Sequence, residues 1–534
     1  MKHSISSALI LLLALALRLY PTLSSGMPFS TDGWGPIRNA EGIIAYSPVD
    51  LSNETVFDGY HNYWPAVSLF GAFLTHVTGL EPVSAMSTGI PTVSALTVLI
   101  FYTLVKRLSG NSGLALVSAL LLAVIYPHSM FTAGVTKETY ATPIYLTVML
   151  LFLGYGKIRE TLLFTIASIA LVMAHHLTAL AAAAVLFTIA AGLAASNFKT
   201  GRSIEKSNFT PAMVLAVAAG LYLEFYAYKG LIARITLTPS DVFSALSYQV
   251  VAFAAALYLI LRKPKPSRFK SALKCIAIPL TVLFIVLLCT RRAIIPGAPT
   301  LPAHYLAYAA PFIAAAPLTV LGAGEIMKSR NSKCLIPAFW ISTLLGLEGY
   351  AIFGAPPLGL SLMYRILNLI TVPLAILCAA GIYRIASGGS SRGLWKIAAS
   401  ALLIFIAASN IYNVYASVAL KERYMGYFWT YTQQEFSAAK WLSKNANQTV
   451  AGDVKVYYML REYFSLKVDA AQALKYLYGE TSSPPSLLVI YDLMADNGFV
   501  IYGGYSVDLP GGWAEKTVCL SQIYSNSFVK IYMG

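Results

Sequence analysis

Residues 64–80, WPAVSLFGAFLTHVTGL, decide the topology of this chain, because they are almost apolar enough to be counted as a membrane span. If they crossed the bilayer, every loop after them would lie on the opposite side. The rest of the sequence must therefore settle whether this run spans the membrane or lies on its surface.

The composition is that of an integral membrane protein. Of 534 residues, 57% are hydrophobic and only 11% are charged, with a mean hydropathy of +0.65. Soluble domains carry about a quarter charged residues. Apolar runs of about 17–25 residues are long enough to cross a bilayer. Thirteen such runs are predicted as spans, near 5–23, 84–105, 113–132, 140–156, 161–175, 177–195, 209–228, 241–261, 275–290, 304–324, 334–353, 366–386 and 394–418. The first run has no small-residue cleavage site after it and is expected to be a retained helix.

The charges between these spans argue against residues 64–80 as a further span. With the N-terminus inside, the inner loops hold 20 Lys and Arg residues against three acidic ones, Glu160, Glu205 and Glu325. Counting 64–80 as a span would move nearly all of this basic excess outside, against the positive-inside rule. We therefore predict a surface helix there, with Tyr63 and Trp64 at the membrane interface. The net charge of +15 then follows from topology and gives no indication of nucleic-acid binding.

The predicted fold is a polytopic α-helical membrane protein with about 13 transmembrane helices and a small extracytoplasmic α/β domain. Residues 1–419 form the transmembrane domain, with a large first outer loop at 20–83, and residues 420–534 form the soluble domain. In that domain Thr432 and Glu435 form a capping box that opens a helix. Strands are expected at 449–452, 487–491 and 528–532, and helices near 454–464 and 469–478.

The candidate functional residues are polar side chains at the predicted outer ends of helices, because ionisable groups at membrane depth are costly and usually face a cavity. They are Asp32, Arg38, Lys137, Glu138, His175, His176, Arg291, Arg292, His304 and Arg365. The sequence has no P-loop, GxSxG or HExxH motif and no metal-spaced Cys/His cluster, so we predict no protein metal site.

Several short motifs give the chain a resemblance to a known family. They are Ser30-Thr31-Asp32-Gly33-Trp34, Tyr63-Trp64-Pro65, Lys106-Arg107-Leu108-Ser109-Gly110 and Thr136-Lys137-Glu138-Thr139-Tyr140. In this order the chain resembles the GT-C glycosyltransferases, which include protein O-mannosyltransferases, the aminoarabinose transferase of lipid A and the catalytic subunit of oligosaccharyltransferase. Thirteen spans and an outward C-terminal domain are most similar to the last of these.

The resemblance implies inverting transfer of a sugar from a polyprenyl-phosphate donor to a protein, glycan or lipid acceptor at the outer face of the cell membrane. An aspartate in the first outer loop of such enzymes is the general base, or helps to bind a metal in oligosaccharyltransferase, and only Asp32 matches it. The donor-phosphate candidates are Arg291, Arg292, Arg365 and Lys137, because cations stabilise the departing phosphate. The substrate-binding candidates are Arg38, Glu138, His175, His176 and His304. No cofactor is expected, unless a pyrophosphate donor requires a divalent metal.

Three departures separate the chain from oligosaccharyltransferase. Asp32 is followed by Gly33 and not by a second acid, the tail has no WWD-type motif, and the outer loop 291–303 is short. They favour transfer of a monosaccharide from a lipid monophosphate over metal-dependent en bloc transfer of an oligosaccharide, which stays an alternative.

Each candidate residue also has a structural interpretation. Asp32 would cap a turn, Arg291 and Arg292 would anchor a helix at the head groups, and Lys137 with Glu138 would form a weak surface pair. His175 and His176 would be interfacial, and a shared metal is disfavoured because adjacent residues on a helix diverge by about 100°.

Two further functions remain open. A transporter or flippase of lipid-linked sugars predicts inverted repeats and charges near the middle of the membrane, which the sequence does not show. A receptor or scaffold that binds through its tail leaves the polar outer residues unexplained.

Overall fold

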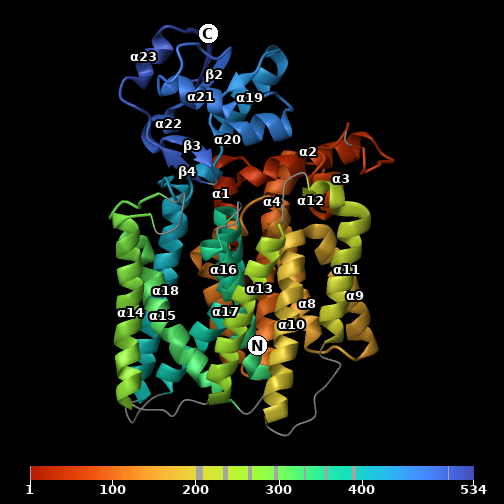
Figure 1. Ribbon diagram of the computed structural model, residues 1–534, viewed down its shortest axis with the longest axis vertical. Helices are drawn as coiled ribbons and strands as arrows, with labels where there is room; N and C mark the ends of the chain where they lie inside the picture. Colours follow the sequence, from red (N-terminus) through yellow and green to blue (C-terminus); the bar gives the residue numbers. More distant parts are fainter. Residues whose placement is uncertain are drawn as a thin grey trace. The chain divides into compact units, whose positions relative to one another are not determined.

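The computed structural model describes residues 2–53, 55–199, 209–232, 238–262, 268–293, 299–329, 332–354, 359–387, 392–502 and 504–534 (Figure 1). The chain divides into two compact units. The helical unit comprises Met1–Leu17, Val93–Thr132 and Ala141–Val414. The loop–tail unit comprises Arg18–Thr92, Ala133–Tyr140 and Tyr415–Gly534. Six of the charges counted for the inner loops lie outside the described residues: Arg202, Glu205, Lys206, Lys263, Lys265 and Arg330.

Helices of 5–28 residues make up the helical unit, and some of them continue into the loop–tail unit. They are α1 Lys2–Ser25, α4 Pro82–Ala95, α5 Thr97–Ser109, α6 Ser112–Val124, α7 Tyr126–Phe131, α8 Lys137–Phe152, α9 Ile158–Ala174, α10 His176–Lys199, α11 Thr210–Tyr222, α12 Tyr228–Ile232, α13 Pro239–Arg262, α14 Arg268–Arg291, α15 Tyr305–Met327, α16 Ile336–Phe353, α17 Gly359–Ala386 and α18 Arg392–Val418. A π-helix, Leu223–Ala227, joins α11 to α12.

Every predicted span falls on one helix or on consecutive helices, and the prediction of a polytopic helical membrane protein is confirmed. Within the described ranges, 9 helical stretches are long and apolar enough to cross a membrane. The remaining predicted spans, 113–132, 140–156, 161–175 and 275–290, fall on α6 with α7, α8, α9 and α14. At 1.5 Å per residue, α8 and α9 are about 24–26 Å long, a little less than a hydrocarbon core of about 30 Å.

Glycines allow α15 and α17 to pack closely. A Cβ atom on Gly322 of α15 would lie 1.7 Å from the Leu377 carbonyl oxygen, and one on Gly381 of α17 would lie 1.9 Å from that of Leu318. Small residues at both crossing points bring the two backbones together, as is typical of helix pairs in membranes.

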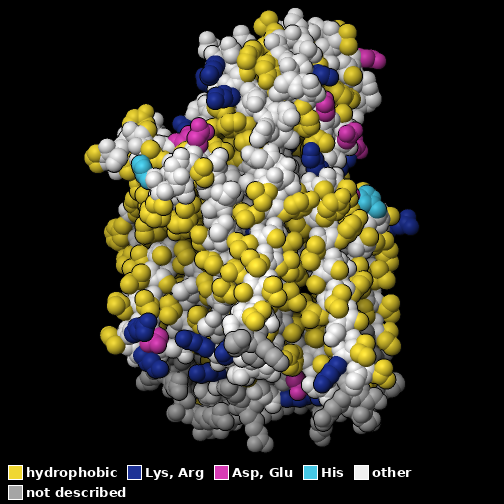
Figure 2. Space-filling view, turned by 180° about the vertical axis from the view of Figure 1, so that it is seen from behind, with side chains coloured by type: hydrophobic (Ala, Val, Ile, Leu, Met, Phe, Trp, Pro, Cys, Tyr) yellow, Lys and Arg dark blue, Asp and Glu magenta, His cyan; other side chains and the backbone are white. Residues whose placement is uncertain are grey.

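The outer surfaces of α13 and α14 are apolar, as a lipid-facing surface requires. Phe243 and Val251 of α13 are 71% and 68% exposed, and Phe284 of α14 is 60% exposed. Figure 2 shows hydrophobic side chains over the helical part, with Lys and Arg side chains gathered toward one end of it. This distribution has the form that the positive-inside rule describes.

The run at 64–80 forms a single short helix in the loop–tail unit. Helix α3, Ala66–Thr78, has 13 residues and packs against α2, Trp34–Ala45. Its length of about 20 Å is too short for a hydrocarbon core of about 30 Å. This length supports the prediction of a surface helix.

The tail is the expected α/β domain, built on a four-stranded sheet of order β1-β2-β6-β5. Its elements are α19 Gln433–Asn445, β1 Val450–Ala451, α20 Val454–Tyr457, a π-helix Tyr458–Tyr463, α21 Ala470–Leu477, β2 Leu487–Tyr491, α22 Asp492–Asn497, β3 Phe499–Tyr502, β4 Tyr505–Val507, α23 Trp513–Val518, β5 Ser521–Ser525 and β6 Val529–Met533. The capping box of Thr432 with Glu435 is present at α19. The sequence did not predict β3, β4, β5, α22 or α23.

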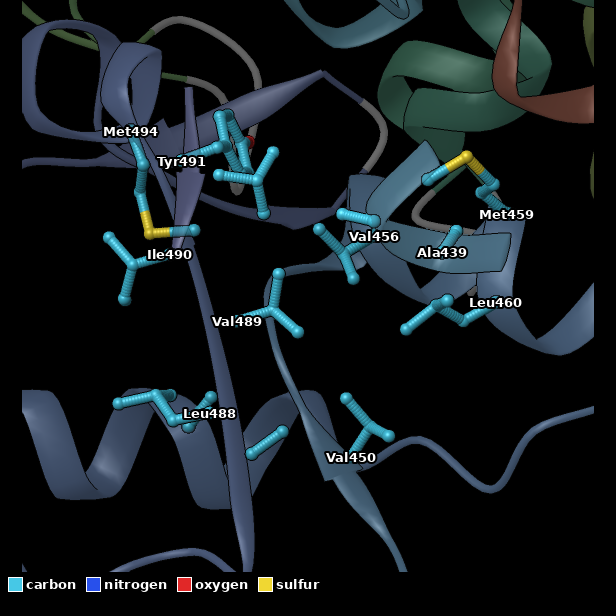
Figure 3. Packing of buried hydrophobic residues seen from close by; sticks show 14 of the residues in the cluster. Ala439, Val450, Val456, Met459, Leu460, Leu488, Val489, Ile490, Tyr491 and Met494 are labelled. Atoms are coloured by element: carbon cyan, nitrogen blue, oxygen red, sulfur yellow. The ribbon is translucent and has the colours of Figure 1, made fainter. Parts of the chain in front are cut away.

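Strand β2 lies at the centre of the tail's core. All five of its residues are buried, and it pairs in parallel with β1 and antiparallel with β6. Figure 3 shows Val489 facing Val456 on one side of the strand, while Ile490 lies beside Met494 on the other. The same cluster of buried apolar side chains includes Trp34 and Met27 from the first loop. The first loop and the tail therefore share one core.

Candidate functional site

Asp32 lies in a tight turn that two other segments of the loop–tail unit, residues 133–140 and the tail, hold in place. It belongs to a 3₁₀ turn, Thr31–Gly33, that opens directly into α2. Ser30 adopts a positive φ of 87°, an uncommon conformation for a residue other than glycine. Its N–H donates to the Trp429 carbonyl at 2.9 Å, and its hydroxyl oxygen accepts from the Asp32 N–H at 3.3 Å. Asp32 itself is half-buried.

The second segment that holds this turn is residues 133–140, which carry two further candidates. The Val135 N–H donates to the Phe29 carbonyl at 3.1 Å. A Cβ atom on Gly33 would lie 2.9 Å from the Val135 carbonyl oxygen, and one on Gly134 would lie 2.8 Å from the Ser30 Cβ. The glycine after Asp32 is therefore required by this close approach, and a second acidic side chain does not fit there.

Lys137 and Glu138 begin α8 and are both buried, with 7% and 5% of their surface exposed. The interpretation of Lys137 with Glu138 as a surface pair is therefore wrong. The Lys137 ammonium lies 3.8 Å from the centre of the Tyr60 ring and 4.9 Å from that of Trp64. Such cation–π contacts stabilise a desolvated ammonium by about 2 kcal/mol. Glu138, in the first turn of α8, is placed where the helix dipole favours a carboxylate.

A largely buried Asp–His pair that the sequence analysis missed lies next to these residues, with 10% of the Asp58 side chain and 6% of the His61 side chain exposed. The Asp58 carboxylate pairs with the His61 ring nitrogen Nδ1 and also accepts from the Asn39 amide at 3.2 Å. Burial alone would raise the pKa of Asp58, but the charge and hydrogen bonds of His61 and the bond from Asn39 outweigh it and hold that pKa well below its usual range. The Asp58-Gly59 turn signal, with a histidine three residues on, was the available clue.

Aromatic side chains of the tail support the helix that follows Asp32. Trp34 is fully buried, and its ring meets Tyr431, Phe436 and Tyr463 at centroid distances of 5.1, 5.7 and 5.5 Å. The Tyr463 hydroxyl donates to Glu41 of α2 at 2.6 Å. Burial raises the pKa of Glu41 above its usual value, and this hydrogen bond offsets only part of the rise. Arg38, also on α2, is half-buried.

An ion pair deeper in the tail supports these aromatic rings. The Lys455 ammonium donates to Glu435 Oε1 at 2.5 Å, and both side chains are buried. The ammonium also lies 4.7 Å from the Tyr491 ring and 5.2 Å from the Tyr431 ring. Because Tyr431 contacts Trp34, this buried pair is part of the packing that fixes the Asp32 turn.

The helical unit contains the other six candidates. His175 is buried at the connection between α9 and α10, where its Nδ1 atom lies 2.7 Å from the Thr178 hydroxyl. The expectation that the two histidine rings diverge on a helix is wrong, because His175 has an extended backbone and its ring centroid lies 5.1 Å from that of His176. A hydrogen-bonded pair of this unit, the His128 ring and Asn368 at 2.9 Å, was also missed.

The four remaining candidates of the helical unit occupy helix ends or half-buried positions. Arg291 ends α14 and Arg292 follows it, and both are exposed. His304 is the exposed residue before α15, with its ring 4.6 Å from that of Tyr305. Arg365 of α17 is half-buried, with its guanidinium 5.7 Å from the Tyr364 ring.

Solved structures with the same architecture identify the fold. No protein-family model matches the sequence, and no curated protein matches it by sequence. The apo oligosaccharyltransferase of Archaeoglobus fulgidus matches 92% of this chain and 70% of its own, with a TM-score of 0.58 and 13% identity. Apo ArnT from Cupriavidus metallidurans matches 100% of this chain and 98% of its own, with a TM-score of 0.51 and 10% identity. Both are GT-C glycosyltransferases.

This chain has the GT-C fold. The resemblance that the short motifs predicted is thus confirmed at the level of architecture, at sequence identities that carry no residue-by-residue equivalence. The site residues named above remain predictions within that fold.

The GT-C fold also raises the question of a metal. The A. fulgidus enzyme has been solved in a complex with zinc and sulfate, with a TM-score of 0.59, 12% identity and matched shares of 92% and 68%. In the described part of this chain no group of three or more His, Cys, Asp or Glu side chains is placed to hold a metal ion. Around Asp32, Gly33 is packed against Val135, so the side chains of this turn do not form an oxygen cage of the kind that divalent cations prefer.

Proposed function

We propose that this protein is an inverting membrane glycosyltransferase that transfers a sugar from a polyprenyl-phosphate donor to an acceptor at the outer face of the membrane. The GT-C fold supports a transferase, and the A. fulgidus enzyme of this fold has been solved with an inhibitory peptide and a dolichol-phosphate. The observation that carries the proposal is the packing of the Asp32 turn against the segment that bears Lys137.

Asp32 is the proposed general base. Its carboxylate takes the proton of the acceptor's nucleophile while that nucleophile bonds to the anomeric carbon from the face opposite the donor phosphate. The bond between the anomeric carbon and the phosphate oxygen breaks, and polyprenyl phosphate leaves. The half-burial of Asp32 suits this role, since the residue is partly accessible and partly shielded from bulk water.

Lys137 is the leading candidate for the group that stabilises the departing phosphate. Its ammonium is buried and lies in the same unit as Asp32. A desolvated cation interacts with an anionic oxygen more strongly than an exposed one. Arg291, Arg292 and Arg365 remain proposed donor-phosphate residues, and Arg38, Glu138, His175, His176 and His304 remain proposed substrate-binding residues.

We further propose that the donor is a monophosphate and that turnover needs no metal. This proposal draws support from the oxygen ligands that the Asp32 turn could offer a metal, because the close packing of Gly33 leaves no space there for a second carboxylate. The second candidate is metal-dependent en bloc transfer from a pyrophosphate donor, which draws support from the A. fulgidus oligosaccharyltransferase of the same fold, solved in a complex with zinc.

The test is incubation of the purified protein with polyprenyl monophosphate and pyrophosphate sugars and with peptide, glycan and lipid acceptors, each with and without EDTA. We expect transfer from a monophosphate donor that EDTA does not reduce. Asp32→Asn should lower kcat by about two to four orders of magnitude, as for other general bases. Asp50→Asn, at an exposed aspartate of the same loop, is the matched control and should leave kcat unchanged. Strict dependence on a divalent metal with a pyrophosphate donor would establish the second candidate.

A further inference from the structure

The turn at residues 58–64 contacts the helix that follows Asp32 and also the side chain of Lys137. On one side, the His61 ring lies against Gly35 in the first turn of α2, which follows Asp32 directly. On the other side, the Tyr60 and Trp64 rings hold the Lys137 ammonium. The two sides are connected through the Tyr60 ring, which packs edge-on against His61 at a centroid distance of 4.9 Å and at a tilt of 59° against Trp64 at 5.4 Å.

His61 and Gly35 fit together without space to spare. A Cβ atom on Gly35 would lie 2.5 Å from His61 Nδ1 and 2.6 Å from Cε1. His61 is only 5% exposed, so its ring has no open direction into which to rotate. The position of this ring therefore determines where the first turn of α2 lies.

Asp58 fixes the ring and also ties the turn to α2. Its carboxylate accepts from the backbone N–H groups of His61 at 2.8 Å and Tyr60 at 3.2 Å, in addition to its pairing with the His61 ring. The same carboxylate accepts from the side chain of Asn39, one helical turn beyond Gly35. This one carboxylate, whose side chain is 10% exposed, thus holds the 58–64 turn on α2 at two places, at Gly35 through the ring and at Asn39 directly.

We propose that Asp58 and His61 are positioning residues for the sugar-transfer site, holding the α2 turn that carries Asp32 at a fixed place relative to the Lys137 ammonium. This inference rests on the proposed function for the roles of Asp32 and Lys137, and on the contacts of the 58–64 turn for the device itself. A displacement of about 1 Å between reacting groups costs about a hundredfold in rate, which is why such a support matters.

The experiment compares Asp58→Asn and His61→Gln with two matched controls, Asp50→Asn and His76→Gln, whose native side chains are exposed. The first readout is hydrogen–deuterium exchange of the backbone amides of residues 38–41 in the full-length protein without substrate. These amides donate to the carbonyls of the first turn of α2. The second readout is the pair kcat and KM for a polyprenyl-phosphate sugar.

We expect both variants to exchange these amides at least about tenfold faster than the wild type and to lose about ten- to a hundredfold in kcat, with KM for the donor changed by less than about threefold. The controls should change neither quantity. Gly35→Ala is the second route to the same result, because its methyl group would push the intact Asp58–His61 pair away from α2.

Unchanged exchange at residues 38–41 in all three variants would overturn the positioning role, whether or not the protein is a transferase. Faster exchange with an unchanged kcat would also overturn it, leaving a pair that only stabilises the fold. A wild-type protein that transfers no sugar from any donor would refute the proposed function instead, and the exchange result would still decide whether the pair holds α2.

Discussion

Gly33→Ala tests whether the close packing of the Asp32 turn against residues 133–140 is needed for stability and turnover. The new methyl group would lie 2.9 Å from the Val135 carbonyl oxygen and 3.2 Å from the Val135 Cβ. Val135 cannot easily retreat, because its N–H is bonded to the Phe29 carbonyl at 3.1 Å. Overpacking of this kind costs about 1–3 kcal/mol in stability.

The same methyl group would separate the Asp32 turn from the segment that carries Lys137. We expect turnover to fall by about ten- to a hundredfold, because a misplacement of a fraction of an ångström to 1 Å between reacting groups has effects of this size. Thermal unfolding of the detergent-solubilised protein and initial rates of sugar transfer measure the two effects separately.

Gly220→Ala is the matched control, because the same substitution in α11 meets no atom within 4 Å. There alanine should raise stability by up to about 1 kcal/mol through its higher helix propensity, with turnover unchanged. Full activity and the wild-type melting temperature in Gly33→Ala would show that the contact with Val135 does not require glycine at position 33. The explanation for why no second acidic residue follows Asp32 would then be wrong.

Three further predictions concern topology and the tail. A cysteine at position 106 should be shielded from an impermeant maleimide in intact cells, while the exposed native Cys519 reacts; labelling at 106 would reverse the orientation. Lys455→Met should destabilise the protein by about 3–5 kcal/mol because the buried Glu435 carboxylate loses its ion-pair partner, and adding Glu435→Gln should restore most of that loss. Burial raises the pKa of Asp453 to about 6, so between about pH 4 and 6 the native state holds a proton that the unfolded state releases. The contribution of Asp453 to the free energy of unfolding therefore falls as pH rises through this range. Denaturant titrations of Asp453→Asn should lack that fall.

The sequence predicted the helices and most of the tail because both follow from periodic, local signals. Long apolar runs marked every span, and the Thr432–Glu435 capping box marked the start of α19. The strands it missed are the weaker cases: β5 is mostly exposed, and β4 has only three residues. Short strands of that kind are stabilised by their sheet partners, and a pairing between distant segments leaves no local pattern.

The candidate site was predicted by residue type but not by surroundings. Charged residues near span ends pointed to Asp32 and Lys137, whereas their neighbours depend on contacts between segments that are distant in the chain. His61 meets Gly35, and Trp429 binds Ser30 across about four hundred residues. No periodicity or spacing encodes such contacts, so the burial of Lys137 could not be foreseen.

The shared core of the first loop and the tail gives the tail a role that composition did not suggest. Trp34, two residues after Asp32, is buried among Tyr431, Phe436 and Tyr463, and its burial contributes roughly 2–3 kcal/mol or more to holding the loop. Because the Ser30 N–H also binds the Trp429 carbonyl, the backbone next to Asp32 is fixed by the tail on both sides of the carboxylate. The tail is therefore part of what places Asp32, and a ligand that moved α19 or the 458–463 helix would change the position of this carboxylate through Trp34.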